Sequence, residues 1–106
     1  RLRAAGVGLI ASTDAGIPGV RHHDLPAALL EFAHFAGLSP VETLRAATSD
    51  CAVALGIDRM TGSIEVGLEA DLLIVEGDPL SDLSVLGQPI EVYARGRAML
   101  GAFAAD

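Results

Sequence analysis

The sequence predicts an α/β unit followed by a β-rich segment, in a chain of 106 residues. Three observations support this fold class. Residues 7–11 form an apolar run without alternation, which is typical of a strand buried on both faces. Residues 25–36 and 39–55 carry helical spacing and helix-capping residues, whereas later segments alternate polar and apolar residues as strands do. We therefore divide the chain into residues 1–56 and residues 57–106.

The first predicted strand ends at a polar loop rich in glycine and proline, residues 12–19. Asp24 is a good helix N-cap, and Pro26 is tolerated in the first helical turn. Gly37 suits the position that ends a helix. Between these ends the apolar residues recur at helical spacing, at Leu25, Ala28, Leu29, Phe32 and Ala36.

A second helix is predicted from a capping box formed by Ser39 and Glu42, with Pro40 at the first helical position. This helix runs to about Thr48. A further short helix covers residues 50–55 and is closed by glycine.

The second half of the chain predicts strands. Some of its segments alternate polar and apolar residues, and others are continuously apolar. Gly-Asp-Pro and other glycine-containing turns separate them. Residues 80–88 are expected to be a loop with one helical turn. The predicted strands are residues 63–66, 70–75 and 90–94, with a further arm at 98–100 after Gly96.

Charge and composition exclude several function classes. The chain has 14 acidic and 7 basic residues and a net charge of −7, so it lacks the clustered positive charge that nucleic acids and anionic membranes require. All basic residues are arginine, which excludes Schiff-base chemistry on a lysine. No apolar run reaches ~18 residues, so no transmembrane helix is predicted. Residues 1–12 lack a signal-peptide cleavage site, and we expect a cytoplasmic protein.

Asp14 is the leading candidate for chemistry, because it follows a predicted buried strand and opens a glycine-rich loop. A carboxylate there can bind a metal or act as a general base, or it can simply accept hydrogen bonds from its own loop. His22 and His23 lie in the same loop. They either contact substrate together with Arg21 or are ordinary polar loop residues.

Four other polar residues are expected to be structural. Cys51 is interpreted as a buried packing residue and His34 as a helix-surface residue. Asp71 is expected to satisfy a local hydrogen bond, and Asp78 with the proline after it indicates a turn.

The order and spacing of four stretches resemble the C-terminal part of a metal-dependent amidohydrolase. The resemblance is to the branch that contains imidazolonepropionase-like enzymes and amidohydrolase-type Xaa-Pro dipeptidases. It covers nearly the whole chain, at residues 8–16, 37–48, 54–75 and 77–96.

The resemblance implies the last βα unit of a (β/α)₈ TIM-like barrel in residues 1–56. It implies the C-terminal strands of a small composite β-sandwich, built from both chain ends, in residues 57–106. Asp14 matches the family aspartate that ligates a divalent metal, expected to be zinc, and accepts a proton from metal-bound water. The implied function is hydrolysis of C–N bonds in a cyclic amide, an amide or a dipeptide.

The chain departs from the family pattern in ways that bear on activity. The His-x-His pair, the two later histidine ligands and the carboxylated lysine of some members are missing. A catalytic zinc needs about three protein ligands, so we expect the chain alone to bind no metal and to be inactive.

An alternative to the enzyme fragment is a non-catalytic assembly module. Such a module would pair with a copy of itself or with a separate N-terminal chain. In either case we expect exposed apolar surface and a homo-oligomer or another partner chain.

Overall fold

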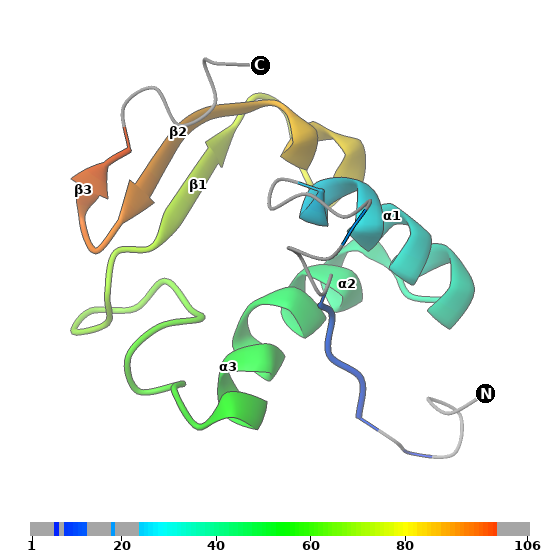
Figure 1. The fold of residues 1–106 in the computed structure, drawn as a ribbon, viewed down its shortest axis with the longest axis horizontal. Helices are drawn as coiled ribbons and strands as arrows, with labels where there is room; N and C mark the ends of the chain where they lie inside the picture. The colour runs from blue at the N-terminus through cyan, green and yellow to red at the C-terminus, as the bar shows by residue number, and fades with distance from the viewer. Residues whose placement is uncertain (1–5, 7, 13–17, 19–23, 100–106) are drawn as a thin grey trace.

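In a computed structural model of the chain, the described residues are 6, 8–12, 18 and 24–99. Among these residues, three helices come first and a three-stranded antiparallel sheet follows, with a 3₁₀ helix inserted between its first two strands (Figure 1). The elements are α1 (Leu25–Ala36), α2 (Pro40–Ala47), α3 (Ser49–Leu55), β1 (Leu72–Val75), η1 (Leu83–Gly87), β2 (Pro89–Ala94) and β3 (Arg97–Ala98).

The first helix is confirmed at its predicted bounds. Gly37 ends it in the left-handed conformation, with φ of 69°, and its N–H donates to the Ala33 carbonyl. Asp24 occupies the predicted N-cap position, but its side chain does not cap the helix and its backbone is helical rather than extended. The position of the N-cap was therefore predicted correctly, but the side-chain hydrogen bond that an N-cap aspartate usually accepts from the helix is not formed.

The capping box of α2 is confirmed in both directions. The Glu42 N–H donates to Ser39 Oγ at 3.3 Å, and the Ser39 N–H donates to Glu42 Oε1 at 3.0 Å. The short helix that follows, α3, is closed by Gly56 with φ of 74°. The helical half of the chain thus follows its local sequence signals closely.

In the sheet, β2 is central and pairs antiparallel with β1 on one side and β3 on the other. Ala94 pairs with Arg97, so residues 95 and 96 form a two-residue hairpin turn. Both have positive φ, 52° at Arg95 and 77° at Gly96, as a type I′ turn requires. The predicted strands at 70–75 and 90–94 are therefore confirmed, with β1 beginning two residues later than expected.

Two predicted strands are not formed in this structure. Residues 63–66 have no strand pairing, and neither do residues 8–11, the described part of the predicted strand at 7–11. The same physical reason applies to both segments. A strand is stabilised by hydrogen bonds to a neighbouring strand. Within the described part of the chain, neither segment has such a neighbour.

The core joins the two halves of the chain. Leu29 of α1 packs with Leu83 and Leu86 of η1, and Leu44 and Val75 pack against this cluster. The helical turn predicted within residues 80–88 is a 3₁₀ helix, and it does more than connect two strands, because it supplies two of the three buried leucines of this cluster.

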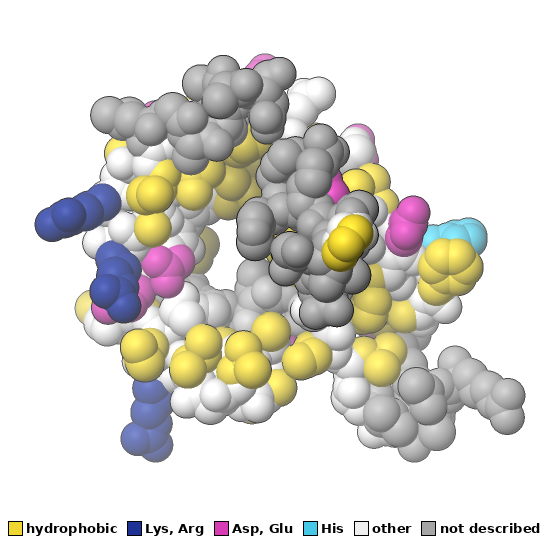
Figure 2. All heavy atoms as spheres, in the orientation of Figure 1, with side chains coloured by type: hydrophobic (Ala, Val, Ile, Leu, Met, Phe, Trp, Pro, Cys, Tyr) yellow, Lys and Arg dark blue, Asp and Glu magenta, His cyan; other side chains and the backbone are white. Residues whose placement is uncertain are grey.

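Much apolar surface lies outside this core, as expected. Many large hydrophobic side chains of the described residues are exposed, among them Phe35 at 84%, Ile64 at 88% and Val66 at 107%. Figure 2 shows a row of hydrophobic side chains across the region where Figure 1 draws α3 and the loop after it. None of the described helices is long and apolar enough to span a membrane.

Candidate functional site

The predicted site residues Asp14, Arg21, His22 and His23 all lie outside the described residues. The structure does describe the segments that lie directly before and after the loop that contains these residues. On one side, residues 8–12 run beside α2, where the Ala11 N–H donates to the Ala46 carbonyl at 3.2 Å. On the other side, Asp24 leads directly into α1. The predicted site loop therefore connects a segment that lies along α2 to the start of α1.

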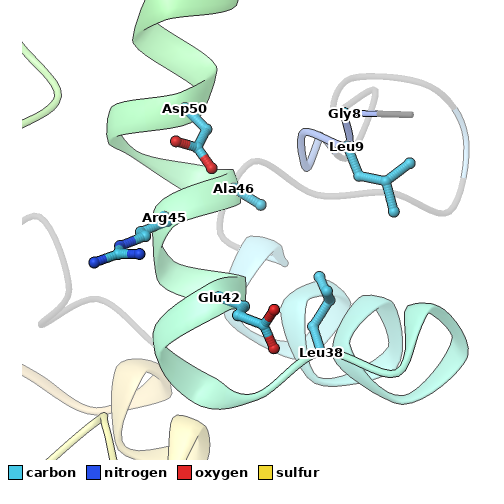
Figure 3. Close-up of a pocket in the computed structure, with 7 residues that line it drawn as sticks. All are labelled: Gly8, Leu9, Leu38, Glu42, Arg45, Ala46 and Asp50. Carbon is cyan, nitrogen blue, oxygen red and sulfur yellow. The ribbon is translucent and has the colours of Figure 1, made fainter. Parts of the chain in front are cut away.

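An open pocket of about 260 Å³ lies between residues 8–9 and the α2–α3 region (Figure 3). Figure 3 shows the Glu42 carboxylate beside Leu38, and the Arg45 guanidinium pointing away from Leu9. Glu42 already accepts the Ser39 N–H of the capping box. Asp50 contributes a second carboxylate from α3. These groups offer no nucleophile paired with a base, so the pocket alone does not constitute a catalytic site.

The described residues do not fit the metal that the resemblance implies. A catalytic zinc needs about three protein ligands. Among residues 6, 8–12, 18 and 24–99, no group of three or more His, Cys, Asp or Glu side chains could hold a metal ion. Asp14 would add one ligand from outside this set. Any metal site must therefore draw further ligands from beyond the described part of the chain.

A larger hollow, which we call the α3–β1 groove, lies between the α2–α3 pair and β1 and has a cavity volume of about 700 Å³. Cys51 is half-buried in its wall rather than fully buried, which corrects the sequence-based interpretation of that residue as part of the core. The groove is mainly apolar, and its walls include Leu44, Cys51, Leu55, Ile64, Leu72 and Leu73.

Asp71 connects three segments at the edge of this groove. Its Oδ2 accepts the Thr61 hydroxyl at 2.7 Å, and its Oδ1 accepts the Arg95 N–H at 2.9 Å. Asp71 thus has a structural hydrogen-bonding role, but the prediction of a local bond was wrong, because its partners lie 10 and 24 residues away in the sequence. The Arg95 backbone hydrogen bond, the Thr61 hydroxyl and the Arg95 charge together lower the pKa of Asp71 below its ordinary value of 3.8.

This lowered pKa predicts how stability depends on pH. The ionised Asp71 carboxylate stabilises the fold above pH 3.8, and that contribution is lost as the pH falls through the lowered pKa. We expect Asp71→Asn to be less stable than the unmodified chain at pH 6 and the difference to shrink below pH 3, in urea unfolding at both pH values. Equal destabilisation at pH 6 and pH 2.5 would argue against an ionic role.

The other polar residues of the sheet region make local contacts. Asp78 accepts the Leu80 N–H at 3.0 Å and the Ser81 hydroxyl at 3.1 Å, which confirms the predicted turn. Hydrogen bonds from the Ser84 hydroxyl and N–H lower the pKa of Asp82. The Tyr93 hydroxyl donates to the Glu91 carboxylate, which raises the pKa of Tyr93. These exposed hydrogen bonds join residues two or three positions apart and stabilise local turn and strand conformations.

His34 lies exposed on α1, as predicted, with its ring edge against Phe35 at a centroid distance of 5.3 Å. The sequence prediction of a helix-surface residue is confirmed.

Comparison with known proteins places these features in a family. The model described as the amidohydrolase family matches residues 1–99. The chain is 35% identical over 88 residues to the ochratoxinase of Aspergillus niger, covering 80% of this chain and 17% of that protein. It is 32% identical over 99 residues to the imidazolonepropionase of Chloroflexus aggregans, covering 91% of this chain and 23% of that protein.

A solved structure of a candidate prolidase from Bifidobacterium longum is also similar, with a TM-score of 0.87 and 40% sequence identity. The match covers 92% of this chain and 24% of that protein. The chain therefore spans about a quarter or less of the length of the relatives that it matches. The resemblance found in the sequence is confirmed.

Proposed function

Because the chain belongs to the amidohydrolase family, we propose that it is the C-terminal part of a hydrolase that cleaves C–N bonds. The observation that carries the proposal is the family match over residues 1–99, together with the small share of each relative that the chain covers. In this proposal, residues 1–56 supply the last βα unit of a barrel, and residues 57–106 supply strands of a small β-sandwich.

We assign the proton transfer of this reaction to Asp14. Hydrolysis of an amide adds water across the C–N bond, so one proton must leave the attacking water and one must reach the departing nitrogen. A carboxylate within hydrogen-bond reach can do both in sequence. Arg21, His22 and His23 share the loop of Asp14, and we assign them to substrate contact.

The amidohydrolase family generally uses a divalent metal, and the chemistry that such an ion supplies is a water of lowered pKa. We propose zinc for the complete enzyme, with ligands other than Asp14 coming from the rest of the polypeptide. Two observations support this: the sequence has no His-x-His pair and no lysine, and no group of three or more His, Cys, Asp or Glu side chains among the described residues could hold a metal ion. On this account the 106-residue chain alone does not catalyse hydrolysis.

The substrate class is tested with the complete hydrolase and a panel of three compound types: Xaa-Pro dipeptides, N-acyl amino acids and cyclic amides. We expect release of a carboxylate and an amine from at least one type, and loss of that activity on dialysis against a chelator. The absence of hydrolysis across the panel in a metal-loaded protein would overturn the assignment.

A further inference from the structure

Helix α1 carries a row of exposed side chains that we call the α1 stripe. Its members recur every three or four residues, which is the spacing that places side chains on one face of a helix. The stripe consists of Ala27, Leu30, Glu31, His34 and Phe35. All five are exposed, and the two large apolar members are Phe35 at 84% and Leu30 at 42%. The α1 stripe is therefore an apolar surface with one carboxylate and one imidazole in its middle.

The α1 stripe lies almost opposite the buried side of the helix. Leu29 and Ala33 form that buried side and pack with the leucines of η1. At 3.6 residues per turn, the mean directions of the two sets are about 150° apart around the helix axis. Figure 2 shows hydrophobic, acidic and histidine side chains next to one another where Figure 1 draws α1. Because the layers of a fold cover the buried side of a helix, the opposite side is left for solvent or another subunit.

A second copy of α1 that runs antiparallel to the first complements the α1 stripe. When the two helices cross at the level of residues 32 and 33, Leu30 faces the partner's Phe35. In the same register, Glu31 faces the partner's His34. A two-fold axis forms each of these contacts twice, because the same patch serves both copies. The stripe thus matches itself in both its apolar and its polar positions.

Glu31 and His34 favour this antiparallel register over the parallel one. A carboxylate accepts hydrogen bonds, and an imidazole has an N–H group to donate whether it is neutral or charged. Within the described part of the chain, neither side chain forms a hydrogen bond or an ion pair, and His34 has only its edge contact with Phe35. A parallel arrangement would instead set each Glu31 against its own copy, and like charges that face each other are unfavourable.

We propose that the α1 stripe is the centre of a two-fold interface between two copies of the complete hydrolase. The Glu31–His34 pairs lie nearest the two-fold axis, and the Leu30–Phe35 pairs flank them on either side. The occupant is a second copy because the stripe supplies both halves of each pair. This inference goes beyond the proposed function, since it does not depend on which C–N bond the hydrolase cleaves.

Exchanging the two polar groups of the α1 stripe in the complete hydrolase tests the pairing. Glu31→Lys sets two donor groups against each other, and His34→Glu sets two carboxylates against each other. Each single variant should raise the dissociation constant at least about tenfold. The double variant restores an acceptor opposite a donor, so its dissociation constant should return to within about threefold of the unmodified value. Sedimentation velocity over a concentration series measures all four proteins.

Glu76→Lys is the matched control, because it makes the same charge change at an exposed position directly after β1. It should leave association unchanged. Weakening by Glu76→Lys equal to that by Glu31→Lys would overturn the proposal, and so would a double variant that associates no better than the single ones. An unmodified protein that is monomeric throughout the concentration series would also overturn it, even if a variant fails to fold.

The interface and the proposed function can fail separately. An active hydrolase whose oligomeric state is the same in all four proteins would reject the interface alone. A protein that loses association in the single variants and regains it in the double variant, but hydrolyses none of the panel compounds, would reject the proposed function alone.

Discussion

Replacing Asp14 by asparagine in the complete hydrolase is expected to lower kcat by roughly 10²- to 10⁴-fold, the range typical of losing a general acid–base group. Asparagine preserves the size of the side chain but cannot accept the proton from water at neutral pH. We expect a smaller change in KM, because the lost interaction acts during bond cleavage rather than in substrate binding. Steady-state kinetics on the best panel substrate measures both.

The same substitution distinguishes the two interpretations of Asp14. If the carboxylate only accepts hydrogen bonds from its own loop, the asparagine carbonyl still accepts them and kcat stays within a few-fold of the unmodified enzyme. Asp58→Asn is the matched control, since Asp58 is exposed in the loop after α3. An Asp14→Asn enzyme as active as this control would contradict the catalytic assignment.

Gly62→Ala is expected to destabilise the fold by about 3 kcal/mol, through backbone strain and overpacking together. Gly62 has φ of 101°, and its added methyl group would meet Ala52 Cβ at 2.5 Å and the Thr48 carbonyl oxygen at 3.2 Å. Relief of this contact requires the loop and α3 to move apart. Urea unfolding, followed by circular dichroism, measures the loss.

Gly67→Ala is the control for this substitution. Gly67 has a similar φ of 94°, but an added β-carbon there meets nothing within 4 Å. Its cost should therefore be the strain alone, about 1–2 kcal/mol. Equal destabilisation by the two substitutions would show that the close packing of Gly62 on α3 is unimportant.

The helical half of the fold was predictable because its signals are local. The bond between Ser39 and Glu42 spans three residues, and Gly37 ends α1 through its own backbone conformation. The hairpin between β2 and β3 was only partly predictable. Gly96 suggested a turn, but Arg95 has a φ of 52° and donates its N–H to Asp71, 24 residues away, a contact that no local pattern indicates.

The missing elements share a physical cause. Residues 8–11 and 63–66 have strand-like sequences, but a strand forms only where another strand pairs with it. The groove between α3 and β1 could not be predicted from local patterns either, because its walls come from segments as far apart in the sequence as Leu44 and Leu86. The position of Asp14 in the sequence, after an apolar run, suggested a site, whereas its role came from the family pattern.

The central claim is that the catalytic site is completed by polypeptide outside this chain. Metal content measured by atomic emission, on the complete hydrolase and on the 106-residue chain purified in the same way, tests it most directly. The account predicts bound divalent metal in the complete protein and none in the 106-residue chain. Stoichiometric metal in the 106-residue chain alone, with hydrolysis of a panel substrate, would contradict it.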